Sequence, residues 1–587
     1  MTLFKNIFGA RNRFATYSKG ARQVVKTTGE ESVNNSTSET TPRLGFRLFV
    51  VFWVVATVWG TNRILNWWHG TDLSLLELTA LAREATYEPL THWRQLGLGL
   101  SVVAGLYYAF YSGSTSKTLW LDALVFGFVR VVVYYTFLTW FRVDGLDLEP
   151  LWTTRLTDRF RFLLGADPTT TTWRVIRDSL SLVFILLTHF LLIICIYLMV
   201  PTFGVDPKAG LGVLRLAVLW AQLVMTFMVA DLFFFFLVFE RLMIPLLFLI
   251  GIWGSPNRVQ ANNYLYFYTT VGAIGMLLAI LYLWTTLQTS HIYDLRLMTR
   301  LLRWAEQTWL WIGFFLSFAI KTPLVPFHIW LPKAHVEAPT TGSVLLAGLL
   351  LKVGLYGVIR ICFGLFPEVS AWAGPVVTAC AVVGMVYASL VTLRQIDMKR
   401  IIAYSSVAHM SLALARIMTG QALGVAAGVY LGLSHGIVSR ALFILVGALY
   451  ARFHNRLVTY YGGLITAMPY FGACFFFFSL ANMAFPLTSG FMGEFLCLTA
   501  LMQQNLLFGV IAASSMLFST VYSVLLFNRV FLGSLKLQFT TARTTDWRSL
   551  DLTANEITIL LPCVVLTMYF GIFPSSLLVP YGIVSSL

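Results

Sequence analysis

Charged side chains stand alone inside long apolar runs of this sequence. Glu240 lies within the run DLFFFFLVFERLMIPLLFLIGIWG, and Lys352 has fourteen uncharged residues before it and seven after it. A charged side chain at the centre of a bilayer costs roughly 2.5 to 3.5 kcal/mol on insertion scales. Such residues usually pair with one another or conduct ions, and a buried group that can exist in both protonation states can pass a proton on.

The segment 321–340, KTPLVPFHIWLPKAHVEAPT, combines charged residues with prolines. Lys321 ends the apolar run WLWIGFFLSFAI and is followed by Pro323 and Pro326. Because a proline removes an amide donor and clashes with the preceding turn, we expect a broken helix. Transporters place ion sites at such breaks, where protein or a water-filled cavity satisfies the freed carbonyls. The alternative is that the prolines only end the helix and that the charged residues lie in an aqueous loop.

A second group of polar residues follows later in the chain. His409 and His435 lie in apolar runs, and Glu494 is close to Pro486 and Gly493 in the segment FPLTSGFMGEFLCL, which indicates a second broken helix. A lone histidine in a membrane is often only an interhelical hydrogen bond. A lone glutamate or lysine at depth is harder to explain by packing. We therefore predict a proton relay of six residues, which are Glu240, Lys321, Lys352, His409, His435 and Glu494.

The composition requires that membrane helices position these residues. Of the 587 residues 58% are hydrophobic and 11% are charged, whereas about a quarter are charged in soluble proteins. A membrane helix needs roughly 20 apolar residues, and because the apolar runs are long and do not alternate, helices are expected rather than barrel strands. We predict an all-α polytopic membrane protein with fifteen spans, at approximately 46–62, 96–112, 118–140, 179–201, 211–230, 231–252, 264–286, 308–331, 341–363, 372–393, 399–417, 422–449, 465–502, 506–530 and 556–579.

The net charge and the cysteines argue against other classes of function. The net charge is +15, but the basic residues lie mostly between spans, where loop orientation explains them better than nucleic-acid binding. The six cysteines occur singly in apolar runs and are expected to be buried, inert thiols. The sequence has no iron–sulfur, haem, GxGxxG or Walker motif. We expect no cofactor, metal or nucleotide site in this chain.

Several motifs, taken in order, resemble the chain 4 family of NADH:ubiquinone oxidoreductase, respiratory complex I. They are KTPLVPFHIWLPKAHVEAPTTGSVLLAGLLLKVGLYG, LRQIDMKRIIAYSSVAHMS, SHGIVSRALF and FMGEF, and the resemblance covers residues 95–581. The family implies fourteen membrane helices with two inverted five-helix repeats, each containing a discontinuous helix. The predicted spans from residue 96 onward also number fourteen. The two proline-containing segments match the two helix breaks.

The resemblance also implies a role for each polar residue. Glu240 is similar to the glutamate of the fifth helix, which pairs with the lysine of the seventh, here Lys321. Lys352 matches the central lysine of the eighth helix. The relay positions of the tenth, eleventh and twelfth helices are matched by His409, His435 and Glu494. Supporting residues beside the relay or at the helix exit are expected to be His328, His335 and Glu337.

Some residues distinguish this chain from its sister chains or depart from the family pattern. Related antiporter-like subunits commonly carry lysine where Glu494 stands, so Glu494 favours chain 4. Asp397 is expected to cap the following helix or balance nearby charges. Arg241 and Arg440 replace residues that are usually small or apolar. If Arg440 faces the relay it raises the cost of a proton at His435, and otherwise it contacts lipid or another subunit.

The N-terminal region has no counterpart in the usual family pattern. We assign residues 1–94 to an extension with a candidate extra membrane helix at 46–62, residues 95–581 to the antiporter-like domain and residues 582–587 to a tail. The first 29 residues contain six Lys or Arg and no acid. This pattern resembles a mitochondrial transit peptide, and the alternative is an arm that packs against neighbouring subunits.

The resemblance implies a proton-translocating subunit whose redox partners lie elsewhere in the assembly. NADH, FMN, iron–sulfur clusters and ubiquinone would be bound by other subunits, and none by this chain. Expected partners are the antiporter-like chains 2 and 5, supernumerary subunits near the N-terminal extension and phospholipids such as cardiolipin, with no nucleic acid. The expected location is the mitochondrial inner membrane, or alternatively a bacterial plasma membrane. Two other functions stay open: a subunit of a multisubunit sodium/proton antiporter, and a scaffold that does not pump.

Overall fold

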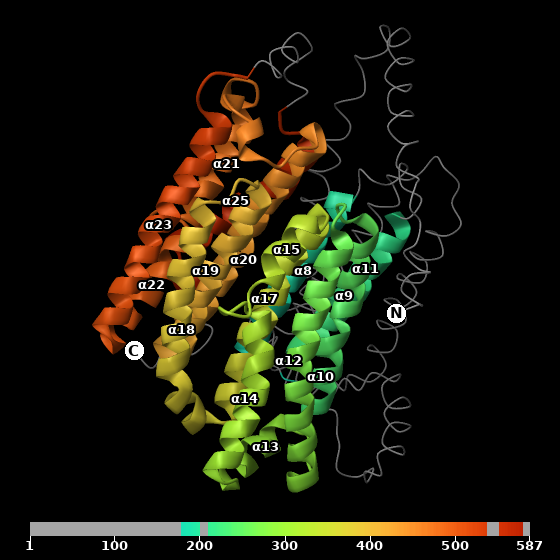
Figure 1. Cartoon of the computed structure of the whole chain (residues 1–587), viewed down its shortest axis with the longest axis vertical. Helices are drawn as coiled ribbons and strands as arrows, with labels where there is room; N and C mark the ends of the chain where they lie inside the picture. Colours follow the sequence, from blue (N-terminus) through green and yellow to red (C-terminus); the bar gives the residue numbers. More distant parts are fainter. Residues whose placement is uncertain (1–175, 177, 200–208, 537–550, 579–587) are drawn as a thin grey trace, which may run out of the picture. The chain divides into compact units, whose positions relative to one another are not determined.

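The computed structural model describes residues 176, 178–199, 209–536 and 551–578. The predicted spans at 46–62, 96–112 and 118–140 lie outside these residues, as do the domain boundary near residue 95 and the tail at 582–587. In the described part the helices lie side by side (Figure 1), and the only β-pairing is two isolated bridges. The all-α fold class is therefore confirmed.

The first group of helices carries Glu240 and Lys321. Its members are α8 (Ser179–Met199), α9 (Ala209–Met228), α10 (Leu232–Arg241), α11 (Met243–Trp253), α12 (Arg258–Leu287), α13 (Ile292–Met298), η2 (Thr299–Leu301) and α14 (Trp304–Lys321). Asp231 caps α10 by accepting a hydrogen bond of 2.8 Å from the amide of Phe234. The predicted span 231–252 is two helices that meet at Leu242, and Pro245 lies in the first turn of α11, where no amide donor is needed.

The first predicted helix break is confirmed. Helix α14 ends at Lys321, and α15 (Trp330–Glu337) begins only after the segment 322–329, which holds Pro323 and Pro326. Such a break frees backbone carbonyls inside the membrane. The indole of Trp330 satisfies one of them, because its Nε1 donates a hydrogen bond of 2.9 Å to the carbonyl of Ile320.

The predicted span 341–363 forms one rod that contains two π turns. Its parts are α16 (Thr340–Leu345), the π turn η3 (Leu346–Leu350), α17 (Leu351–Gly357) and the π turn η4 (Val358–Phe363). Helix α17 packs closely on α14 at Gly357, where an added Cβ would lie only 2.2 Å from the ring of Phe318. Only glycine permits this approach, which places Lys352 close to the broken helix.

The long helix α20 is the centre of the described bundle. It follows α18 (Pro367–Leu393) and α19 (Met398–Ile417) and spans Ala422–Phe453. It contacts α16, α17, α19, α21, α22 and α25, and nearly every residue from Gly424 to Leu449 is buried. The predicted cap of α19 is confirmed, because the carboxylate of Asp397 accepts a hydrogen bond of 2.9 Å from the amide of Lys399.

The second predicted helix break is also confirmed. The chain passes through η5 (Val458–Tyr460) and η6 (Leu464–Thr466) to α21 (Pro469–Asn482), α22 (Ser489–Gln504), α23 (Leu506–Phe531), α25 (Ala554–Ile572) and α26 (Ser575–Leu578). The predicted span 465–502 is interrupted at 483–488, which includes Pro486. Gly493 lies within α22 rather than in the break, and it lets α22 approach α20, since an added Cβ would meet the Cα of Leu431 at 3.0 Å.

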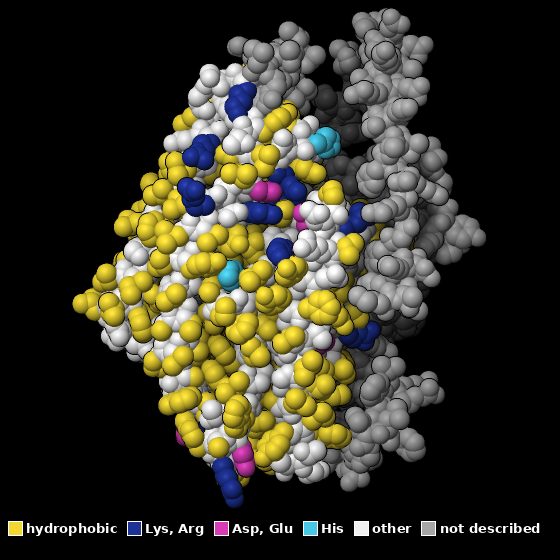
Figure 2. Space-filling model, in the orientation of Figure 1, with side chains coloured by type: hydrophobic (Ala, Val, Ile, Leu, Met, Phe, Trp, Pro, Cys, Tyr) yellow, Lys and Arg dark blue, Asp and Glu magenta, His cyan; other side chains and the backbone are white. Residues whose placement is uncertain are grey.

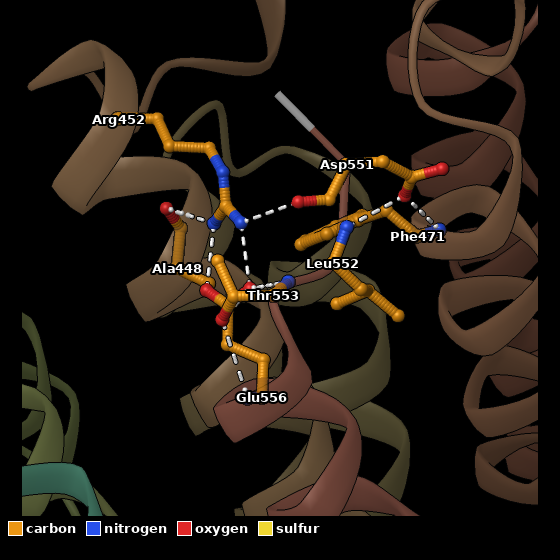
Figure 3. Close-up of polar contacts among 7 residues, drawn as sticks. All are labelled: Ala448, Arg452, Phe471, Asp551, Leu552, Thr553 and Glu556. Carbon is orange, nitrogen blue, oxygen red and sulfur yellow. Dashed lines mark hydrogen bonds and ion pairs between the residues drawn. The ribbon is translucent and has the colours of Figure 1, made fainter. Parts of the chain in front are cut away.

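An ionic cluster fixes the end of α20 to α21 and α25 (Figure 3). Arg452 donates hydrogen bonds of 2.8 and 2.6 Å to the two carboxylate oxygens of Glu556 and one of 3.0 Å to the carbonyl of Asp551. The carboxylate of Asp551 accepts hydrogen bonds from the amides of Tyr470 and Phe471 at the start of α21. Three helices are thus held by one connected set of contacts.

The described surface fits a membrane. Nine continuous helical stretches in the described part, such as 232–253 and 340–363, are long and apolar enough to span one, and hydrophobic side chains dominate the face in Figure 2. Residues such as Phe267 and Leu517 are more than half exposed.

The prediction that all six cysteines are buried is wrong for Cys380, which is exposed, and Cys474 is only half-buried. A thiol is apolar enough to face lipid from a helix surface.

Candidate functional site: a buried proton relay

Lys352 and His435 form the centre of the site. The Lys352 side chain is 0% exposed, and its Nζ donates a hydrogen bond of 2.6 Å to the carbonyl of Ala347 and lies 3.1 Å from Nδ1 of His435. Ala347 belongs to the π turn η3, and π turns are frequent at functional sites. Here the turn supplies a carbonyl that holds the lysine amine against α20. A proton can pass directly between the two nitrogen atoms.

His435 continues the path through two further side chains. Its ring centroid lies 5.6 Å from that of His409 on α19, and Nδ1 of His409 lies 2.9 Å from Oε1 of Glu494 on α22. The Nε2 atoms of both histidines have no hydrogen-bond partner among the described residues. The structure therefore brings four of the six predicted relay residues into one buried series that crosses α17, α20, α19 and α22.

Glu240 and Lys321 lie apart from this series. The Nζ of Lys321 is buried, 3.3 Å from the sulfur of Met243 and 4.4 Å from the ring centroid of Phe239. Oε1 of Glu240 is buried without a hydrogen-bond partner in the described part of the chain. Glu240 nevertheless interacts electrostatically with Lys321. The two residues thus interact through space and form no direct ion pair.

The three expected supporting residues have different surroundings. His335 is 0% exposed and stacks on Phe443 with ring centroids 4.8 Å apart, and neither of its nitrogen atoms has a hydrogen-bond partner among the described residues. It interacts electrostatically with Lys352. Glu337 instead accepts a hydrogen bond of 3.2 Å from the amide of Asn257, and His328 packs edge-on to two tyrosines. Of the three, only His335 lies beside the relay.

The sequence did not reveal a small cavity near the end of the series, with apolar and polar residues in its lining. The cavity has a volume of about 10 Å³, which is about the room that one water molecule needs. Its polar lining consists of Ser405, Ser479, Asn482, Tyr522 and Ser523. The hydroxyl of Tyr522 is buried, has weak polar contacts with Ser405, Asn482 and Ser519, and interacts electrostatically with Glu494. These residues come from α19, α21 and α23, so no local spacing could have predicted them.

The two unusual arginines have different positions. Arg241 is exposed, so it does not oppose Glu240 inside the bundle. Arg440 is fully buried and interacts electrostatically with Lys352. It therefore faces the relay. Among the described residues, no group of three or more His, Cys, Asp or Glu side chains could hold a metal ion.

Two broken membrane helices beside a buried series of lysine, histidines and glutamate define an ion-translocating membrane subunit of the antiporter-like class. Residues 229–520 match the family described as "NADH:quinone oxidoreductase/Mrp antiporter, TM". The chain is 42% identical over 404 residues to NADH-ubiquinone oxidoreductase chain 4 of Chondrus crispus, covering 68% of this chain and 80% of that one. It belongs to the NADH-ubiquinone oxidoreductase chain 4 family.

A bacterial relative and a solved structure agree with this assignment. NADH-quinone oxidoreductase subunit M of Rickettsia conorii is 38% identical over 402 residues, covering 68% of this chain and 80% of the relative. A chain in the structure of respiratory complex I from Thermus thermophilus with bound NADH superposes with a TM-score of 0.66 at 26% identity, covering 83% of this chain and 97% of that one. The chain is thus a multi-pass membrane subunit of the NADH:quinone oxidoreductase type.

Proposed function

We propose that this chain translocates protons across the membrane as a core membrane-arm subunit of respiratory complex I. The observation that carries the proposal is the buried series from Lys352 through His435 and His409 to Glu494. Each member can bind and release a proton, and each charge in the membrane costs free energy that a function must offset. Electron transfer from NADH to ubiquinone, with FMN and iron–sulfur clusters, would take place in other subunits.

The geometry suggests how the relay is driven. The proton on Lys352 is shared with Nδ1 of His435 and passes by His409 to Glu494. At the other end, Glu240 acts on Lys321 through space rather than through a direct contact. Movement of Glu240 towards or away from Lys321 would change the electrostatic field at Lys321, and through it the ease with which Lys352 gives up its proton.

The family also suggests partners and a location. This chain would contact the neighbouring antiporter-like chains 2 and 5, supernumerary subunits near the N-terminal extension and phospholipids such as cardiolipin. The mitochondrial inner membrane is the location we favour, because the basic N-terminal segment fits it. The bacterial relative keeps a bacterial plasma membrane as the alternative.

The proposal is tested with the isolated native assembly reconstituted into liposomes. NADH:quinone activity and proton uptake are measured for the wild type, Lys352→Ala and Glu240→Gln, with exposed Lys536→Ala as the control lysine. Both relay variants should lose proton pumping while the assembly is still detected, and the control should pump normally. A normal ratio of protons to electrons in Lys352→Ala would refute the mechanism and favour a scaffold.

A second candidate function is that of a subunit in a sodium/proton antiporter. The family description covers both classes, and broken helices are common to both. The same liposomes decide between them. The complex I assignment is supported if proton uptake requires NADH and if flavin and iron–sulfur proteins copurify with the chain. The antiporter is supported if a sodium gradient alone drives the exchange of sodium for protons.

A further inference from the structure

Arg440 is a buried cation with almost no hydrogen-bond partners. Its Nε donates to the carbonyl of Gly436 one turn earlier on α20, and its guanidinium lies over the ring of Phe190 on α8, 5.3 Å from the centroid. Nη1 and Nη2 have no hydrogen-bond partner among the described residues. Arg416 is equally buried but donates hydrogen bonds to the carbonyl of Ala500 and the side-chain oxygen of Gln421. Arg440 is therefore not held by the contacts that usually stabilise a buried arginine.

The groups that face Arg440 do not neutralise it. The titratable side chains that interact with it are the thiols of Cys195 on α8 and Cys563 on α25, and the relay residues Lys352 and His435. No carboxylate forms an ion pair with Arg440 within the described part of the chain. An uncompensated charge in the interior is costly, and a guanidinium keeps its charge where a lysine would lose it. Such a residue needs a function to explain it.

Arg440 and Lys352 flank the same close contact between two helices. A Cβ added to Gly348 in η3 would lie 2.8 Å from Cδ of Arg440, so the arginine stem fills the space that this glycine leaves. A Cβ added to Gly436 would lie 3.4 Å from Cε of Lys352 and 3.6 Å from the carbonyl of Gly348. The two cationic side chains thus reach the Gly348 and Gly436 contact together.

We propose that Arg440 is a fixed positive charge that pushes the proton shared by Lys352 and His435 away from Lys352. It would act as a positioning residue for the proton and not as a carrier. The inference rests on the proposed function of the relay.

Arg440 acts on both members of the central pair, Lys352 and His435. Its repulsion makes a proton less stable on either nitrogen atom and so favours release of the proton from Lys352. The released proton can continue through His409, which faces His435 from α19, to Glu494 on α22.

The test replaces the charge and keeps the volume. In the reconstituted assembly, Arg440→Met retains an apolar stem beside Gly348, and exchanging a buried charge for an apolar isostere is often tolerated. Arg440→Gln is the polar counterpart. Arg452→Gln removes a guanidinium from the same helix at the ionic cluster with Glu556 and is the matched control. Proton pumping per NADH oxidised is measured against pH for each variant.

We expect both Arg440 variants to move the pH profile of pumping towards higher pH by about one unit, because Lys352 then keeps its proton longer. The Arg452 control should lower the amount of assembly and leave the profile in place. The inference would be overturned if the pH profile of Arg440→Met does not move. It would also be overturned if only one of two assembled Arg440 variants shifts, or if the control shifts by the same amount. If Arg440→Gln does not assemble, Arg440→Met decides. Pumping that persists in Lys352→Ala would instead refute the proposed function.

Discussion

The Nζ atom of Lys352 lies 3.1 Å from Nδ1 of His435, a direct contact between α17 and α20. The same amine is held by the carbonyl of Ala347 in a π turn. Because His435 also adjoins His409, it links the lysine to the path that ends at Glu494. The function of the relay should therefore be most sensitive to this histidine.

We expect His435→Gln to reduce proton pumping at least about tenfold, because general acid–base groups typically contribute a hundredfold or more. Glutamine can accept a hydrogen bond from Lys352 but cannot carry a proton onward. Ser439→Ala is a fitting control, since Ser439 is buried on the same helix and bonds only the carbonyl of His435. Pumping in liposomes is compared with NADH oxidation, and equal losses in both variants would argue against a specific role of the imidazole.

Tyr522 offers a comparison of two buried hydroxyls. Its hydroxyl has only weak polar contacts, with Ser405, Asn482 and Ser519, whereas the hydroxyl of Tyr430 donates a hydrogen bond of 2.5 Å to the carbonyl of Phe570. Removing a weakly bonded hydroxyl costs less than losing a well-formed buried hydrogen bond, which costs about 1 kcal/mol or more. Tyr522→Phe should therefore lower thermal stability less than Tyr430→Phe does. If Tyr522 connects a water molecule in the cavity to Glu494, Tyr522→Phe should also pump protons more slowly. A drop in thermal stability equal to that of Tyr430→Phe would contradict the weak bonding of the Tyr522 hydroxyl.

The pair of Arg452 and Glu556 should contribute measurably to stability (Figure 3). Both side chains are more than three-quarters buried, and the two hydrogen bonds are bidentate. Removing one partner leaves the other charge uncompensated. We expect a coupling free energy of about 1 to 2 kcal/mol between Arg452→Gln and Glu556→Gln in a double-mutant cycle of thermal unfolding. A coupling near zero would show that the pair only fills space at the ends of α20 and α25.

The sequence predicted the helical fold because apolar runs and prolines are local signals. Both breaks lie where Pro323, Pro326 and Pro486 indicated them. The sequence could not show which polar residues meet, since that depends on how α17, α19, α20 and α22 pack. The direct ion pair of Glu240 with Lys321 was expected from resemblance alone, and the structure places Met243 and Phe239 against the lysine amine instead.

A pH effect on stability is expected at the start of α8. Burial raises the pKa of Asp178, but the guanidinium of Arg360 beside it and the bond from the amide of Ser181 outweigh this, so that the pKa lies below its usual 3.8. A carboxylate with a lowered pKa in the folded state stabilises above its unfolded pKa, and this contribution disappears as the pH falls through the folded pKa. Asp178→Asn should therefore lower thermal stability at pH 7, and by progressively less as the pH falls below 3.8. A deficit that stays constant as the pH falls would show that Asp178 acts by hydrogen bonding alone and not by its charge.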